Sequence, residues 1–382
     1  MRIVYMLGDY PKVSNSFIDI EIDELMKRGY DIDIVSMNEG DRSALSDSFI
    51  KNFLYVKKQS TVYNIITGHF LCIIRSPMSY IKLFIDSILK ILNYKIFIKY
   101  AWVAQNDIFK NADLIYSHFF EPQSELCRLV SKIRNIPYIV KMHGSDMLDD
   151  KTSYAIIKDS CRTLVVNTGN LKRFSSVFPD CKDKLLLHGC GISLNQFHKN
   201  HDALITDKII SVGRHVEKKG VDILLRATAQ LIENGINVHV DIVGDGPHRE
   251  KSIELCKNLK IEENVMFHGN ILNSKLCEYY NRAGIYVLAS ADEGKPVALM
   301  EAMACSLPVI ATRVGDVSDM IRDGVSGFII DIGDENALVD RLTRLLFDRE
   351  LMINMGQEAK IDSENFDLKK QVDILCEVIS KC

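Results

Sequence analysis

Short apolar runs alternate with longer amphipathic stretches along most of the chain. Arg2–Leu7 is a β-branched run that stops at Gly8-Asp9, whereas Asn15–Arg28 has the 3.6-residue period of a helix, and Asp31–Met37 predicts the next strand. Further strands of the first half are predicted at Asp113–Ser117, Pro137–Lys141, Arg162–Asn167 and Lys184–His188, with helices at Glu121–Arg134 and Leu171–Phe178.

A second series of the same kind follows a polar stretch, 197–207, that we interpret as a linker. Its predicted strands are Lys208–Val212, Val238–Val243, Val265–Phe267, Gly284–Ala289, Pro308–Ala311 and Gly327–Ile330. Helices are expected to start near Gly220, Pro247, Asn273, Pro296, Val317 and Asp334, and a last amphipathic helix is expected at Asp367–Ser380.

Alternation of strands and helices predicts an α/β fold with parallel sheets covered by helices on both faces. With 382 residues, the chain exceeds the roughly 250–300 residues that one core serves, so two domains are expected. We predict doubly wound, Rossmann-like domains at 1–200 and 206–365, followed by a C-terminal helical segment at 366–382.

Composition narrows the class of protein. A hydrophobic content of 47% excludes a wholly disordered chain, and a net charge of -4 argues against nucleic acid as a partner. The ten cysteines contain no CxxC pair, so we expect reduced thiols in a cytoplasmic protein. No signal peptide and no apolar run of the ~18 residues needed to cross a bilayer are recognised, which predicts a soluble or peripheral protein.

Charge is concentrated in the segment 51–100, which has eight basic residues and one acidic residue, Asp86, among many aromatic and aliphatic ones. A basic, aromatic, partly helical segment suits the surface of an anionic membrane. A solvated helix face beside a core-facing stripe is the other interpretation, and both remain open here.

Candidate chemistry begins with Arg214, at the end of the strand Lys208–Val212, and Lys219, just before a helix. Ligands of open α/β sheets bind at the carboxyl ends of strands, and a helix N-terminus attracts anions. Arg and Lys in these places suit a diphosphate. Gly244 and Gly246 form a turn after the next strand. A dinucleotide fingerprint would have a third glycine where this chain has Arg249. The turn is therefore interpreted either as a close approach to a nucleotide or as purely structural, and both interpretations remain open.

Two glutamates, Glu293 and Glu301, are separated by seven residues, one in a loop at a strand end and one within an apolar helix. A buried carboxylate needs hydrogen-bond partners, which ribose hydroxyls could supply to Glu301. In the first half, His143 ends a strand together with Gly144 and Asp146, and a His in such a place can hydrogen-bond a sugar or a leaving phosphate.

These motifs, in this order, resemble the family 4 glycosyltransferases, which have the two-domain GT-B fold. The matching elements are Gly213-Arg214 with Lys219-Gly220, Gly244–Pro247, Val265–Gly269, Glu293 with Glu301, and His143–Asp146. The opening segment Tyr10–Ile18 is similar to the branch that builds exopolysaccharides such as colanic acid and amylovoran.

The resemblance implies two Rossmann-like domains facing a central cleft, with the C-terminal helix crossing back to the first domain. It implies that His143, Arg214, Lys219 and Glu293 are catalytic. The implied nucleotide-sugar contacts are Arg214, Lys219, Gly244, Gly269, Asn270, Ile271, Glu293, Gly294, Lys295, Pro296, Val297 and Glu301. The implied acceptor side is Gly8, Ser14, Asn15, His143 and Asp146.

The family's chemistry is retaining transfer from a nucleotide-diphosphate sugar, with UDP expected ahead of GDP, to a saccharide or lipid-linked saccharide. No cofactor and no metal are implied. Departures from the family pattern at Asn15, Ser306 and 314–319 leave the donor and the acceptor open. Another GT-B enzyme, such as a nucleotide-sugar epimerase or a soluble-acceptor transferase, and a non-catalytic carbohydrate-binding protein remain the alternatives.

Overall fold

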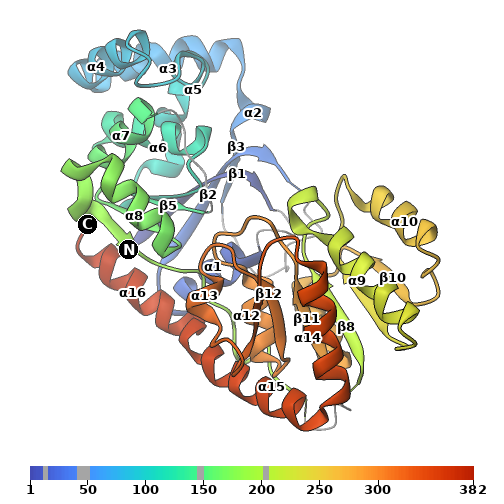
Figure 1. Cartoon of the computed structure of the whole chain (residues 1–382). Helices are drawn as coiled ribbons and strands as arrows, with labels where there is room; N and C mark the ends of the chain where they lie inside the picture. Colours follow the sequence, from blue (N-terminus) through green and yellow to red (C-terminus); the bar gives the residue numbers. More distant parts are fainter. Residues whose placement is uncertain (12–15, 41–51, 144–149, 201–205) are drawn as a thin grey trace. The chain divides into compact units, whose positions relative to one another are not determined.

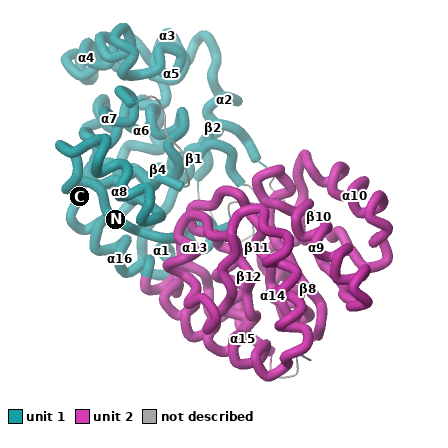
Figure 2. The backbone as a smooth tube through the Cα atoms, in the orientation of Figure 1, with its two compact units in different colours: residues 1–189, 371–382 teal, residues 190–370 magenta. Residues whose placement is uncertain are grey.

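Two units, each built on one parallel β-sheet, divide the chain (Figure 2). The computed structural model describes residues 1–11, 16–40, 52–143, 150–200 and 206–382. Unit 1 contains residues 1–189 together with 371–382, and unit 2 contains residues 190–370.

The sheet of unit 1 has seven strands in the order β3-β2-β1-β4-β5-β6-β7, all parallel where they pair. Their bounds are β1 Arg2–Tyr10, β2 Asp31–Glu39, β3 Phe53–Tyr55, β4 Leu114–His118, β5 Tyr138–Met142, β6 Arg162–Val165 and β7 Leu185–Leu187. The central strands β4 and β5 are buried along their whole length, as expected for a sheet that is covered on both faces. The strand order reverses beside β1, so the carboxyl ends of β1 and β4 flank the switch point of this sheet.

Helices connect these strands (Figure 1). The helices of unit 1 are α1 Ser16–Lys27, α2 Val56–Gln59, α3 Val62–Arg75, α4 Pro77–Ile88, α5 Tyr94–Tyr100, α6 Pro122–Arg134, α7 Asp150–Asp159 and α8 Thr168–Val177. Helix α6 has a clear signal at each end: Pro122 occupies its first turn, where no amide donor is needed, and Asn135 ends it in a left-handed conformation.

The sheet of unit 2 has six strands in the order β10-β9-β8-β11-β12-β13, again parallel throughout. The strands are β8 Lys208–Val212, β9 His239–Val243, β10 Val265–Gly269, β11 Ile285–Leu288, β12 Val309–Thr312 and β13 Gly327–Ile330. The helices are α9 Val221–Glu233, α10 Arg249–Asn258, α11 Asn273–Arg282, α12 Val297–Ala304, α13 Val317–Met320, α14 Glu335–Phe347 and α15 Arg349–Ser363. The order reverses between β8 and β11, which makes their carboxyl ends the switch point of unit 2.

The last helix, α16 Leu368–Ser380, joins unit 1 from Gln371 onward. Its Val372 and Leu375 are buried, and the Asp373 carboxylate lies 2.5 Å from the Arg28 guanidinium. His188 contacts the carbonyl oxygen of Gln371 at 2.9 Å.

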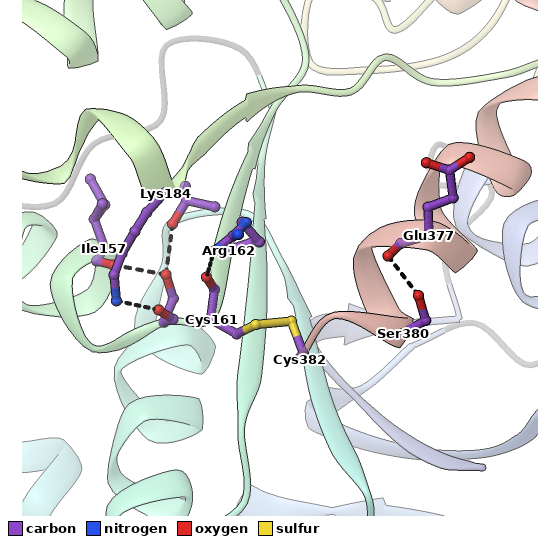
Figure 3. The surroundings of a disulfide bond; sticks show 9 residues. Ile157, Cys161, Arg162, Lys184, Glu377, Ser380 and Cys382 are labelled. Atoms are coloured by element: carbon purple, nitrogen blue, oxygen red, sulfur yellow. Dashed lines mark hydrogen bonds between the residues drawn. A yellow bond between two sulfur atoms is a disulfide. The ribbon is translucent and has the colours of Figure 1, made fainter.

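A disulfide between Cys161 and Cys382 ties the end of the chain to the start of β6 (Figure 3). The expectation that all ten cysteines are reduced is therefore wrong for this pair. The two residues are 221 positions apart in sequence, so no spacing rule could have paired them. The remaining eight cysteines form no disulfide, and six of them are buried.

The predicted order of elements is confirmed, and most bounds agree within a few residues. Strand β1 continues through Gly8 to Tyr10, so Gly8 does not end it as predicted. The sequence pattern missed β3, α7 and α15; α15 buries Gly356, Ala359 and Ser363 along with two methionines, a stripe too small in side-chain size to show as apolar. Within the described residues, no helix is both long enough and apolar enough to cross a membrane.

Candidate active site

The switch point of unit 2 brings together three of the predicted residues. Arg214 and Lys219 follow β8, and Glu293 follows the neighbouring strand β11. Arg214 is exposed, whereas Lys219 and Glu293 are partly buried. The Lys219 ammonium lies 2.5 Å from Oε1 of Glu293. Positive charge from one strand end is thus held against a carboxylate from the next.

Ser290, which the sequence analysis did not single out, fixes the other side of Glu293. Its hydroxyl donates to Oε1 of Glu293 at 2.7 Å. Thr312, at the end of β12, donates to the Ser290 carbonyl at 2.5 Å. Three adjacent strand ends therefore hold one carboxylate oxygen in place, which leaves Oε2 as the oxygen with lone pairs directed elsewhere.

Close backbone packing explains why Lys219 reaches β11. Gly220 adopts φ +63°, and a Cβ atom there would lie 2.0 Å from the carbonyl oxygen of Ala289. Only glycine fits both the conformation and the space. The Ala291 amide also donates to the Lys218 carbonyl at 2.7 Å, so the two loops are joined directly.

The glycine turn after β9 packs against the same loop. A Cβ atom on Gly244 would lie 2.0 Å from the Gly213 carbonyl oxygen, and the Gly244 amide donates to the Gly269 carbonyl at 2.8 Å. These contacts account for Gly244 as a structural turn, and its contact with a nucleotide stays a prediction. Asn270 and Ile271 follow β10 in the loop before α11, at the same end of the sheet.

The segment Gly294–Val297 leads from Glu293 into α12. Its course is fixed by Gly315, where a Cβ atom would lie 2.3 Å from the Glu293 carbonyl oxygen, and by an amide of Asp316 that donates to the Gly294 carbonyl at 3.1 Å. Pro296 precedes the first residue of α12. The Lys295 ammonium lies 5.4 Å from the centre of the Phe366 ring, a cation–π contact that the sequence did not reveal.

Glu301 lies inside α12 and is buried, as its apolar surroundings predicted. The Tyr280 hydroxyl donates to Oε2 at 2.9 Å, and the Asn273 amide donates to Oε1 at 3.1 Å, both from α11. Burial raises the pKa of Glu301 to about 7 in spite of these two hydrogen bonds. The predicted need for partners is thus met by side chains, and each oxygen keeps a lone pair for a further donor.

In unit 1, His143 follows β5 and belongs to a connected polar cluster. Nε2 of His143 lies 3.0 Å from Nδ1 of His118, whose Nε2 lies 3.1 Å from Glu21. The buried Lys141 ammonium contacts the second oxygen of Glu21 at 2.8 Å. The ring of Phe119, a residue with a φ of +67° that is rare for aromatic side chains, packs with its centre 4.6 Å from that of His143.

The hydrogen bonds of this cluster fix which imidazole nitrogen carries the proton. Burial alone would raise the pKa of Glu21, but Lys141 and His118 hold it well below its usual range, so Glu21 is an acceptor. Desolvation lowers the pKa of both histidines, which are therefore neutral near pH 7. His118 must donate through Nε2 to Glu21 and accept at Nδ1 from Nε2–H of His143. The acceptor nitrogen of His143 is consequently Nδ1.

Other predicted site residues have different outcomes. Ser14, Asn15 and Asp146 lie outside the described residues. Gly8 is part of β1, and its carbonyl accepts from the Ser36 hydroxyl at 2.9 Å.

A cavity of about 270 Å³ lies beside the Arg214 loop. Its lining includes His215, Glu217, Asp222, His248 and Lys251, and none of the predicted donor-binding residues. Among the described residues, no group of three or more His, Cys, Asp or Glu could hold a metal ion.

Sequence comparison finds a family of enzymes that is similar to most of unit 2. Residues 195–362 match the family "Glycosyl transferases group 1". The matched segment covers most of unit 2 and less than half of the whole chain. It contains Arg214, Lys219, Glu293 and Glu301, so the polar residues of the switch point lie within the part of the chain that the family describes.

Related proteins extend the similarity beyond unit 2. The chain is 27% identical over 282 residues to N-acetyl-alpha-D-glucosaminyl L-malate synthase of Bacillus anthracis, covering 69% of this chain and 72% of that protein. It is 34% identical over 141 residues to the putative colanic acid biosynthesis glycosyltransferase WcaL of Escherichia coli K12, covering 35% of each. The colanic-acid resemblance thus covers about a third of the chain.

Solved structures share the fold of both units. Anabaena Alr3699/HepE in complex with UDP and glucose has a TM-score of 0.77 at 16% identity and covers 99% of both chains. The fold is therefore that of the GT-B glycosyltransferases, as predicted. Together with the family match, this fold supports glycosyltransferase activity.

Proposed function

We propose that this protein is a retaining glycosyltransferase that moves a sugar from a UDP-sugar to a saccharide acceptor. The acceptor class that we propose is a lipid-linked saccharide. The observation that carries the proposal is the Lys219–Glu293 pair, held at the switch point of unit 2 beside Arg214. The choice of UDP is supported by the similar fold of Anabaena Alr3699/HepE, which was solved in complex with UDP and glucose and with UDP-glucose.

Arg214 and Lys219 would stabilise the charge that develops on the departing nucleoside diphosphate. An ammonium has three N–H donors, so Lys219 can keep its contact with Glu293 and still donate to a phosphate oxygen. Arg214 adds a planar fork that matches a phosphate. Placing such donors where negative charge develops is often the largest single contribution to catalysis.

The two glutamates would bind opposite ends of the donor. Glu293, fixed through Oε1 by Lys219 and Ser290, would accept hydrogen bonds from the transferred sugar through Oε2. Glu301 would accept the ribose hydroxyls, with Gly269, Asn270 and Ile271 near the base and Gly294–Val297 near the diphosphate or sugar. His143 would act in transfer by accepting a hydroxyl hydrogen bond at Nδ1.

The biological setting we propose is cell-surface polysaccharide synthesis at the cytoplasmic side of a bacterial membrane. Support comes from the partial similarity to WcaL. No cofactor and no metal are included in the proposal, which makes activity in EDTA part of its test.

A thermal-shift titration with UDP, GDP, ADP and CDP tests the donor site directly. Ligand at 100 times its dissociation constant adds about 2.7 kcal/mol of stability. We expect a response to UDP that persists in EDTA and is lost in the Arg214→Ala/Lys219→Ala variant. A well-folded sample that responds to no nucleotide contradicts the proposal.

Product analysis then separates transfer from the other reactions of this fold. Incubation with a UDP-sugar and no acceptor should leave the sugar configuration unchanged. An epimerase would instead convert the sugar under these conditions. With an accepted saccharide, NMR of the product should show the anomeric configuration of the donor. Inversion at the anomeric carbon would overturn the retaining mechanism but not the transferase activity.

A further inference from the structure

Exposed hydrophobic side chains are concentrated in one part of unit 1. Of the twenty-six large hydrophobic side chains that are exposed among the described residues, fifteen lie between Val62 and Ile98. This segment contains α3, α4 and α5, which gather at one end of unit 1 (Figure 1). Apolar side chains scattered singly over a surface are ordinary, but a contiguous set marks an interaction site.

Helix α3 carries a continuous apolar stripe on its exposed side. Val62, Ile66, Phe70 and Ile74 follow one another at four-residue spacing, and each is more than 60% exposed. Side chains four residues apart lie on the same face of a helix. The buried residues of α3 are instead Gly68 and Cys72, so the helix presents its larger apolar face outward.

Helix α4 repeats this arrangement. Met78, Ile81, Ile85 and Ile88 follow at spacings of three, four and three residues and are all exposed. Leu83 and Asp86 are the buried residues of α4. Two consecutive helices therefore expose stripes that a water-facing helix would fill with polar residues.

Inner contacts hold this outward orientation. Gly68 lets α3 approach Trp102 so closely that a Cβ atom on Gly68 would lie 2.2 Å from the Cβ atom of Trp102. On α4, the Asp86 carboxylate accepts from the buried Arg128 guanidinium of α6 at 2.7 Å. Rotating either helix to hide its stripe would break these contacts, so the apolar face is built into the fold.

The charges of the same segment have one sign at the surface. Asp86 is the sole acidic residue between 52 and 100, and it is buried and paired. The basic residues are all exposed; they are Lys57, Lys58, Arg75, Lys82, Lys90, Lys95 and Lys99. Arg75 ends α3, Lys82 lies on α4 and Lys90 follows α4, so the α3–α4 surface is both apolar and positively charged.

We propose that the α3–α4 surface binds an anionic lipid bilayer, with both helices lying in the plane of the headgroups. Apolar stripes flanked by lysines are what such an interface accommodates, since the acyl chains take the stripes and the lipid phosphates take the cations. At 1.5 Å per residue, the 14 residues of α3 span about 21 Å, less than the ~30 Å of a hydrocarbon core, which favours lying in the interface over crossing it.

Charge also argues against a second copy of the chain as the occupant. In a two-fold symmetric dimer the same surface patch meets itself. Lys82 and Lys90 would then face an equally basic patch, and the described segment 52–100 offers no exposed carboxylate to compensate them. An anionic bilayer satisfies the apolar and the basic features together.

Flotation with vesicles tests the apolar part of the proposal. The probe is the full-length protein with vesicles of phosphatidylglycerol and phosphatidylcholine in 0.1 M salt, compared with pure phosphatidylcholine. The variant is Phe70→Asp/Met78→Asp, and its matched control is Phe347→Asp/Ile361→Asp, which adds the same charge at two exposed hydrophobic positions of unit 2. We expect the first variant to bind more than tenfold more weakly and the control to bind like the wild type.

Charge reversal tests the basic part. Lys82→Glu/Lys90→Glu should weaken binding at low salt by at least fivefold per lysine, with the difference shrinking as salt is added. Lys251→Glu/Lys257→Glu, on exposed positions of α10, changes the net charge equally and should have little effect. Equal losses in both double variants would mean that net charge, and not the α3–α4 surface, drives binding, which overturns the proposal.

Two further results would overturn it. One is a wild-type protein that stays monomeric and does not float with anionic vesicles. The other is a dimer in light scattering that Phe70→Asp/Met78→Asp dissolves, because the occupant is then a second copy. UDP thermal shifts measured on every variant verify folding and test the donor site independently, so failure of the membrane proposal and failure of the proposed function give different results.

Discussion

The polar clusters at the two switch points differ in how they are built. In unit 2, Lys219 and Glu293 come from loops and are partly exposed, and Arg214 beside them is exposed. In unit 1, Glu21, His118 and Lys141 come from a helix interior and two strands, and all three are buried. The unit 2 cluster is therefore available to a charged ligand, whereas the unit 1 cluster neutralises its own charges and presents one oriented imidazole, His143.

The largest effect should come from the unit 2 cluster and should fall on activity. In the proposed function Lys219 donates to the leaving diphosphate, so we expect Lys219→Ala to lower kcat/KM by about a thousandfold. Lys218→Ala is the matched control, because Lys218 is the adjacent residue and pairs with Asp292 at 2.8 Å in the same loops. Steady-state kinetics with a responding UDP-sugar measure both. Similar losses in the two variants would mean that general loop charge, and not the position of Lys219, matters.

The free energy of unfolding, in contrast, should depend most on the unit 1 cluster. Lys141→Met leaves the Glu21 carboxylate buried without its ammonium, which typically costs about 3–5 kcal/mol. Urea unfolding measures this cost, with Lys27→Met as control, since Lys27 pairs with Asp23 on the exposed side of α1 and should contribute under about 1 kcal/mol. The double variant Lys141→Met/Glu21→Gln should recover part of the loss. A small effect of Lys141→Met would show that Glu21 is solvated or protonated instead.

The same contrast explains what the sequence could predict. Arg214, Lys219 and Glu293 follow apolar runs directly, and strand ends of parallel sheets meet at one edge, so their proximity was predictable. Glu21 carries a weaker signal: it lies three residues after Ile18 and four before Leu25, on the buried face of α1. His118 directly follows the predicted strand Asp113–Ser117, and His143 lies two residues after the predicted strand Pro137–Lys141, so the rule that found His143 would also have found His118.

Other features could not be predicted from pattern at all. The partners of Glu301 come from α11, and no periodicity indicates that Asn273 and Tyr280 point at α12. The Cys161–Cys382 disulfide and the orientation of α3 depend on tertiary packing, as at Gly68 against Trp102. Sequence pattern thus predicted the order of elements and the loop-borne charges, while buried pairings required the structure.

Glu301, in unit 2, makes the stability of the protein depend on pH. Its pKa is about 7 in the folded protein against about 4.5 when unfolded, so between these values only the unfolded chain releases the proton. This group therefore lowers stability as pH rises from about 4.5 to about 7, by on the order of 3 kcal/mol in total. The stability difference between Glu301→Gln and the wild type should shift in favour of the variant over this range. Parallel urea-unfolding curves from pH 5 to pH 8 would contradict the raised pKa.

The smallest effect should isolate the orientation of His143. His118→Leu removes the acceptor for Nε2–H of His143, so the imidazole can reverse its tautomer and present a donor at Nδ1, where the proposed role of His143 requires an acceptor. Losing one such hydrogen bond corresponds to about a five- to tenfold fall in kcat, with the KM for the donor unchanged. His118→Gln keeps one donor for Glu21 and one acceptor for His143, and it should recover part of kcat. A merely structural role for His118 would lower the melting temperature of both variants without separating their kcat values, so kinetics and melting measured side by side decide whether the buried cluster of unit 1 acts on the reaction or only on the fold.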